Sequence, residues 1–214
     1  PWPDFINDLL YYQNSISRSL SRFLKDEEVE TGIYEILKDI LAFYRAGRAY
    51  IFETDEENHF YNCTYEVVAE GVKAEINKLQ EIPVDFMPWW TSQILGKKPI
   101  LFETLKPMPG MGQGEYEVLS RQGIKALMAT PLVVNDHVYG FMGVDLVDGS
   151  ASWSDEDYRW LSSLANVISI CLELRRAKEK VIFEQAALAR SERLFKNIFA
   201  NIPAGVEIYD KEGN

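Results

Sequence analysis

Two apolar segments separated by only two residues constrain the fold of this chain more than any other feature. They are KALMATPLVV at 125–134 and HVYGFMGVDLV at 137–147. The joining residues, Asn135 and Asp136, tolerate the positive φ that a tight hairpin turn requires. The sequence therefore predicts an antiparallel hairpin here.

Residues 46–68 predict a second pair of strands. AGRAYIFET at 46–54 and NHFYNCTYEVV at 58–68 are rich in aromatic and β-branched residues and are separated by the polar turn DEE. Before them, residues 27–44 repeat apolar side chains with a helical period, and the broad apolar face is typical of a helix that packs on a sheet.

The middle of the chain, residues 69–123, is irregular. It predicts a short helix over MPWWTSQILGK, a strand at PILFE, a Gly/Pro-rich loop at ETLKPMPGMGQG and a short helix at EYEVLSRQG. Loops of this length inside a domain usually have a function, so we expect the middle segment to be functional.

The last long helix is predicted to begin at Ser154. The Ser154 hydroxyl can cap the free backbone amides, and Asp157 can reach back to the cap. Two narrow apolar stripes, one at each end of the chain, favour parallel pairing of helices in a homodimer. Their residues are Leu9, Ile16 and Leu20 near the start and Leu174, Val181, Leu188 and Phe195 in the last helix.

Composition narrows the partners. The chain is 47% hydrophobic and 26% charged, as globular chains are, and its formal net charge of −11 disfavours nucleic acid and anionic membrane surfaces. It lacks a run of about 18 apolar residues and a secretion signal, which predicts a cytoplasmic protein. Cys63 and Cys171 lie far apart, so neither a disulfide framework nor a metal site is indicated.

Several segments of the sequence resemble those of a GAF domain. GIKALMATPLVVNDHVYGFMGVDLVDGSASWSDEDYRWLSSLANVISICLE looks like the C-terminal half of that family, with Pro131, the Gly-x-x-Gly of Gly140 and Gly143, and a Ser-capped helix. YNCTYEVVAEGVKAEINKLQEIPVDFMPWWTSQILGKKPILFE is similar to GAF domains of bacterial histidine kinases and diguanylate cyclases. SERLFKNIFANIPAGVEIYDKEGN resembles the opening of a PAS domain.

This resemblance implies an α+β fold. It has about six antiparallel strands, with the N- and C-terminal helices on one face and a pocket roofed by short helices and loops on the other. The expected divisions are a signalling helix at 1–25, the GAF domain at 26–172, a coiled-coil linker helix at 173–192 and the incomplete PAS domain at 193–214.

The expected pocket combines aromatic roof residues with residues of the strands. Adjacent helical residues point about 100° apart, so only one of the two neighbouring tryptophans is expected inside. The alternatives are that the tryptophans only plug the roof and that Asp145 is a solvated carboxylate at a strand end. The candidate residues are Tyr65, Phe86, Trp89, Trp90, Phe102, Met128, Thr130, Phe141 and Asp145.

The resemblance implies a sensory domain that binds an unidentified small molecule and relays the change to an output domain, without being an enzyme itself. The bilin-binding run Pro-x-Ser-Asp-Ile-Pro and the Asn-Lys pair of cyclic-nucleotide-binding relatives are absent from the sequence. The cofactor therefore stays open. The rival interpretations are a structural dimerisation module with a filled pocket and, with less support, a thiol-dependent GAF enzyme.

Overall fold

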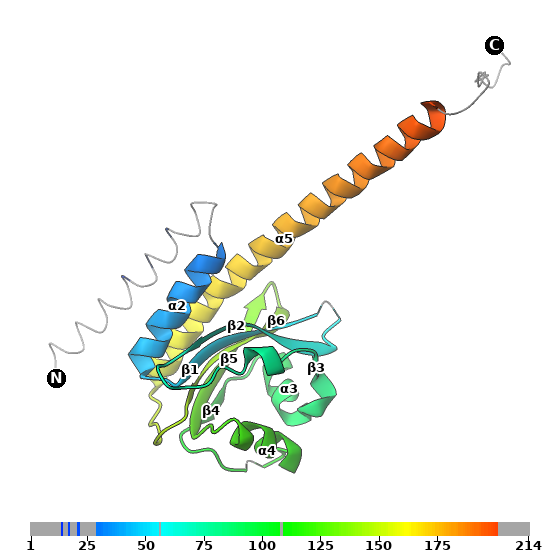
Figure 1. The fold of residues 1–214 in the computed structure, drawn as a ribbon. Coiled ribbons are helices and arrows are strands. Elements are labelled where there is room, and N and C mark those ends of the chain that lie inside the picture. The colour runs from blue at the N-terminus through cyan, green and yellow to red at the C-terminus, as the bar shows by residue number, and fades with distance from the viewer. Residues whose placement is uncertain are drawn as a thin grey trace. The chain divides into compact units, whose positions relative to one another are not determined.

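A computed structural model describes residues 29–55, 57–107 and 109–200, together with residues 14, 17 and 21. Its centre is one six-stranded sheet in the order β3-β2-β1-β6-β5-β4, with every neighbouring pair antiparallel (Figure 1). The fold is therefore the predicted α+β arrangement. The strands are β1 (Arg48–Thr54), β2 (Phe60–Val68), β3 (Ile82–Pro83), β4 (Ile100–Phe102), β5 (Ala126–Val134) and β6 (His137–Leu146).

The predicted hairpin is confirmed as β5 and β6. Asn135 and Asp136 both have positive φ, 48° and 67°, which matches the right-handed twist of the two strands. β6 also pairs with β1, so the two predicted pairs of strands join at the middle of the sheet.

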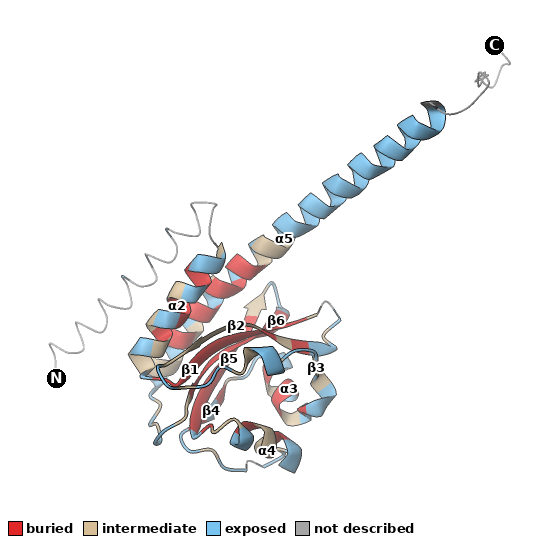
Figure 2. Ribbon diagram, viewed as in Figure 1, coloured by how far each residue is buried: buried red, intermediate tan, exposed pale blue. Residues whose placement is uncertain are grey.

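Two helices cover one face of the sheet. They are α2 (Val29–Tyr44) and the first part of α5 (Asp155–Ala200). Their inner faces and one face of the strands form a continuous core, in which Ile36, Leu164 and Met142 are fully buried (Figure 2). The predicted cap of α5 is confirmed, because the Asp157 amide donates to the Ser154 hydroxyl and the Ser154 amide donates to the Asp157 carboxylate.

Short helices cover the opposite face, as predicted for the roof of a pocket. They are η1 (Ile76–Lys78), η2 (Val84–Phe86), α3 (Pro88–Leu95) and α4 (Gln113–Arg121). A second buried cluster lies between them and the sheet and is rich in aromatic side chains, including Phe52, Trp90 and Phe141.

A β-bulge in β2 decides which of its residues face each layer. Ile51 of β1 pairs with Tyr65, but Phe52 pairs with Cys63, so Thr64 is the extra residue. Beyond the bulge the alternation of side chains along the sequence is reversed. Tyr65 therefore packs into the core under α2 and α5.

The two glycines of the Gly-x-x-Gly motif let β6 approach its neighbours. Gly140 has φ +143°, and a Cβ there would collide with the carbonyl of Phe52. A Cβ at Gly143 would lie 2.8 Å from the ring of Tyr50. The motif therefore serves packing between β6 and β1.

The chain divides into two compact units, one ending at Glu173 and the other beginning at Leu174. In the second unit Leu174, Val181, Leu188 and Phe195 lie on α5 with more than half of each side chain exposed. The predicted stripe of Leu9, Ile16 and Leu20 and the PAS-like residues 201–214 lie outside the described residues.

Candidate functional site

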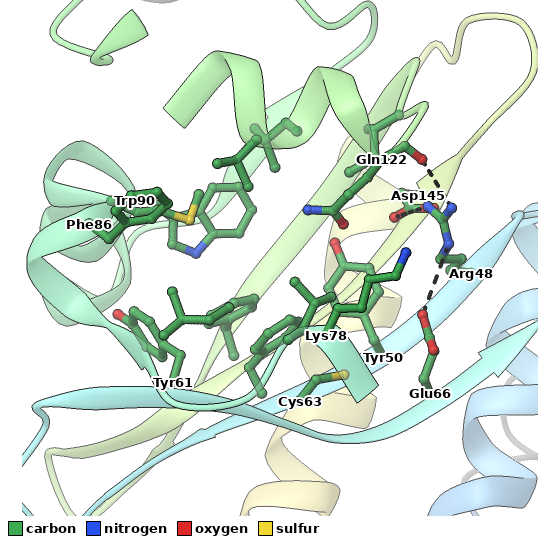
Figure 3. Close-up of a pocket in the computed structure, with 18 residues that line it drawn as sticks. Arg48, Tyr50, Tyr61, Cys63, Glu66, Lys78, Phe86, Trp90, Gln122 and Asp145 are labelled. Carbon is green, nitrogen blue, oxygen red and sulfur yellow. Dashed lines mark hydrogen bonds and ion pairs between the residues drawn. The ribbon is translucent and has the colours of Figure 1, made fainter. Parts of the chain in front are cut away.

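A cavity of about 240 Å³ lies between the sheet and its roof of short helices (Figure 3). Its floor comes from β1, β2 and β6, and its walls come from η1, α3 and α4. The lining residues are Arg48, Tyr50, Phe52, Tyr61, Cys63, Glu66, Lys78, Leu79, Ile82, Phe86, Met87, Trp90, Val118, Leu119, Gln122, Ile124, Phe141 and Asp145.

One end of the cavity is built around the guanidinium of Arg48. Arg48 and Asp145 are direct partners in the β1–β6 register, and Nη1 of Arg48 lies 3.3 Å from both carboxylate oxygens. The same guanidinium donates to the carbonyls of Lys73, at 3.1 Å, and Gln122, at 3.0 Å. One side chain thus connects the sheet floor to two segments of the roof.

A second carboxylate, Glu66, lies on the other side of Arg48, with 4.0 Å between its Oε1 and the Arg48 Nε. Its oxygens accept hydrogen bonds from the backbone amides of Glu75 and Ile76, at 2.9 Å to 3.1 Å. Glu66 therefore fixes the segment that leads into η1.

Burial sets the electrostatics of this end. It raises the pKa of Asp145 to about 6, although the neighbouring Arg48 opposes the shift. Burial, with the charge of Asp145 adding to it, also raises the pKa of Tyr50 well above its ordinary value. The Tyr50 phenol is thus a neutral hydroxyl at every physiological pH, and Figure 3 shows it turned toward Gln122 and Asp145.

The other end of the cavity is aromatic. Phe52 and Phe141 stack with ring centroids 4.7 Å apart, and Tyr61 and Trp90 meet Phe141 edge-on, each at 5.3 Å. The indole N–H of Trp90 is buried and contacts no hydrogen-bond acceptor among the described residues. Figure 3 shows this nitrogen turned toward the opposite wall, where Tyr61 lies.

Cys63 is also in the lining, but its thiol is poorly suited to nucleophilic chemistry. It is buried, and burial together with the charge of Glu66 raises its pKa far above the ordinary value. The thiolate, which is the reactive form, is therefore disfavoured. Among the described residues no three His, Cys, Asp or Glu side chains form a cluster that could hold a metal ion.

The cavity gathers Phe86, Trp90, Phe141 and Asp145 from the predicted set. Trp89 and Phe102 pack against each other beside it, outside the lining. Tyr65, Met128 and Thr130 lie on the other face of the sheet. Met128 and Tyr65 belong to the core under the helices, and Thr130 lies between Met128 and Leu132 on the same face of β5.

Sequence reasoning missed the residues that build the polar end, Arg48, Tyr50, Glu66 and Gln122. One signal was available for Arg48: it is a charged residue directly before the apolar run AYIF of a predicted strand, and the structure buries all seven residues of that strand. A buried charge needs a partner. Asp145 was the carboxylate in the comparable apolar strand β6.

The GAF domain family matches residues 28–172, which is more than half of the chain. The chain belongs to the GAF domain family. A GAF domain is a sensory module. No helix in the described part of the chain combines the length and the apolar character needed to cross a bilayer.

One curated relative of this GAF chain is the "Methanogenesis regulatory histidine kinase FilI" of Methanothrix harundinacea. It is 26% identical over an alignment of 149 residues, and the match covers 68% of this chain. The chain spans only 16% of the length of that relative. The homology to a regulatory histidine kinase is thus distant.

The GAF fold here is similar to that of chromophore-binding GAF domains of known structure. The phycocyanobilin-bound GAF domain of a cyanobacterial phytochrome has a TM-score of 0.64 at 13% identity, covering 78% of this chain and 96% of that chain. The blue-light absorbing form of the PixJ GAF domain from Thermosynechococcus elongatus has a TM-score of 0.57 at 18% identity, covering 69% of this chain and 86% of that chain. At these identities the likeness concerns the fold alone.

Proposed function

We propose that this chain is the ligand-sensing segment of a longer cytoplasmic signalling protein. A small molecule binds in the cavity under α3 and α4, and the change in packing passes through helices to an output domain of the histidine kinase type. In this proposal, residues 193–214 begin a PAS module that lies between the sensing segment and the output domain. The observation that carries the proposal is the cavity itself, which joins a buried polar end to an aromatic end.

The position of the polar end supports a relay. Arg48 connects the loop at Lys73, the end of α4 at Gln122 and the central strand β6. A ligand that moves either roof segment therefore acts on the strands against which α2 and α5 pack. A difference in affinity of about 1.4 kcal/mol between two helix arrangements is enough to change output tenfold.

Helix α5 supplies a route toward the output. It runs without interruption from Asp155 to Ala200, and its first turns pack on the sheet. The exposed seven-residue repeat of Leu174, Val181, Leu188 and Phe195 supports pairing with the same helix of a second copy. Two arrangements of such a pair would form the switch.

Two other functions have weaker support. A thiol-dependent enzyme needs a reactive cysteine, and the Cys63 thiol is buried with a raised pKa. A purely structural dimerisation module is consistent with the exposed repeat on α5. It gives no role, however, to the indole N–H of Trp90, which is buried and has no acceptor in the described part of the chain.

A screen of the purified chain against a metabolite library tests the proposal, with thermal shift and native mass spectrometry as readouts. The matched variants are Val118→Phe, which enlarges a lining residue, and Leu95→Phe, which makes the same kind of change on an exposed α3 position outside the lining. We expect at least one compound to bind, Val118→Phe to abolish its binding and Leu95→Phe to preserve it.

The relay is tested on the same samples. Spin labels on Ala189→Cys, an exposed position of α5, report the distance between the two helices of a dimer. We expect the bound compound to change this distance. A screen without any bound species, or binding that Val118→Phe leaves intact, would contradict sensing in this cavity and favour the structural module.

A further inference from the structure

The size and the charges of the cavity restrict the chemistry of its ligand, and this restriction rests on the proposed function. A cavity of about 150 Å³ lined by apolar side chains holds one benzene ring. The 240 Å³ present here therefore suits one substituted ring.

Every charged group of the lining already has a partner within the protein. The Arg48 guanidinium is shared among Asp145 and two backbone carbonyls, and the oxygens of Glu66 accept two backbone amides. Lys78 lies 2.6 Å from Glu75 with most of its side chain exposed. A charged ligand would lose its hydration without gaining an uncommitted opposite charge, which makes burial of either sign unfavourable.

Two buried groups of the lining have no such partner among the described residues, the hydroxyl of Tyr61 and the indole N–H of Trp90. Trp90 is 2% exposed, and its indole N–H contacts no acceptor among the described residues. A buried donor without an acceptor is costly, so a ligand that offers an acceptor gains more than one that does not. At the opposite end, the Tyr50 hydroxyl and the Gln122 amide are neutral groups turned toward the cavity (Figure 3).

We infer that the cavity binds a neutral ligand of about one aromatic ring that carries a hydrogen-bond acceptor, which the indole N–H of Trp90 recognises. The ring lies among Phe52, Phe141 and Trp90, where edge-on and stacked contacts add to the burial of apolar area. Neutral polar substituents face Tyr50 and Gln122.

Four probes of similar size test this class by NMR titration of the full chain: acetophenone, ethylbenzene, benzoate and benzylammonium. Acetophenone is neutral and has a carbonyl acceptor, whereas ethylbenzene is neutral and lacks one. We expect acetophenone to bind about tenfold more tightly than ethylbenzene, because of one hydrogen bond. Benzoate and benzylammonium should bind more weakly than acetophenone by on the order of a hundredfold.

The role of Trp90 is tested with Trp90→Phe, and Trp89→Phe is the matched control because Trp89 lies outside the lining. Trp90→Phe should reduce the preference for acetophenone over ethylbenzene to about one, and Trp89→Phe should retain it. The wild-type protein gives a second readout, since the indole proton resonance of Trp90 should move downfield with acetophenone and not with ethylbenzene.

The inference would be overturned if benzoate or benzylammonium bound as tightly as acetophenone or more tightly. It would also be overturned if Trp90→Phe kept the preference for acetophenone over ethylbenzene, or if the indole resonance did not move. Failure of all four probes would overturn it as well. The metabolite screen separates this failure from that of the proposed function. If the screen finds a charged ligand in the cavity, sensing stands and the neutral class is wrong, whereas a silent screen removes both.

Discussion

The guanidinium of Arg48 and the carboxylate of Asp145 meet across the two central strands, with Nη1 3.3 Å from each carboxylate oxygen. Both residues are almost fully buried. Because Arg48 also donates to two carbonyls of the roof, this pair holds the floor and the roof of the cavity together. The pair is therefore part of the architecture of the site and also sets its charge.

Removing Arg48 alone should be strongly destabilising. Arg48→Met leaves Asp145 and Glu66 buried without their cation, and we expect a loss of about 3–5 kcal/mol in the free energy of unfolding, measured by urea denaturation. Arg48→Met combined with Asp145→Leu should recover part of this loss, because the uncompensated carboxylate is removed.

The matched control is Arg121→Met, since Arg121 forms an exposed pair with Glu117. It should change stability by at most about 0.5 kcal/mol. A loss at Arg48→Met no larger than that of the control would show that the ion pair does not hold the site.

Asp145 should make stability depend on pH in a defined direction. Its folded pKa of about 6 exceeds the ordinary value of 3.8, so the folded protein binds the proton more tightly than the unfolded chain does. The contribution of Asp145 to the free energy of unfolding is therefore fully present below about pH 4 and is lost as the pH rises through about 6.

The measurement is the free energy of unfolding of wild type minus that of Asp145→Asn, between pH 4 and pH 7. The contributions of the other carboxylates cancel in this difference. It should fall by up to about 3 kcal/mol as the pH rises. A difference that is flat, or that rises with pH, would mean that Asp145 titrates in the ordinary range or below it.

Two glycine substitutions should have opposite effects. Gly140→Ala places a Cβ against the Phe52 carbonyl at a positive φ, so it should destabilise the fold by several kcal/mol, on the order of other severe backbone clashes. Gly114→Ala adds a Cβ with no atom within 4 Å in helix α4 and should stabilise by about 0.5–1 kcal/mol. Thermal unfolding of both variants is the check, and similar melting temperatures would contradict the register of β6 beside β1.

The repeat on α5 predicts self-association. Leu174→Asp combined with Val181→Asp should weaken the dimer in sedimentation experiments, because charges replace two of the four exposed apolar side chains of the repeat. Ala186→Asp combined with Ala189→Asp adds the same charge at exposed positions outside the repeat and should leave association unchanged. An unaltered molecular weight in the variant of the repeat would remove the paired-helix part of the proposal.

Periodicity and turn chemistry were sufficient to predict the β1–β2 and β5–β6 pairs, helix α2 and the Ser154 cap, because each depends on residues close in sequence. The single six-stranded sheet with both helices on one face was implied by the resemblance to GAF domains. Which face of the sheet each β2 side chain takes was harder to predict from the sequence. A period of two would place Tyr61, Cys63 and Tyr65 on one face, but the bulge at Thr64 sends Tyr65 to the other core. Nothing in the local sequence marks that extra residue.

The polar end of the cavity could not be assembled from the sequence either. Arg48, Glu66, Gln122 and Asp145 come from four separate elements, and only the register of β1 with β6 and the position of α4 bring them together. The helical rotation of about 100° per residue predicted that only one of the two adjacent tryptophans faces inward, but it did not decide between Trp89 and Trp90.

The bulge in β2 also determines how this strand tolerates a change of length. Deletion of Thr64 alone would give an uninterrupted ladder with β1, with Cys63 and Glu66 still facing the cavity and Tyr65 still facing the helices. Loss of one residue from β1, which has no spare position, would instead invert every side chain on one side of the gap. Length variants of this domain can therefore arise in β2 without exchanging its two faces.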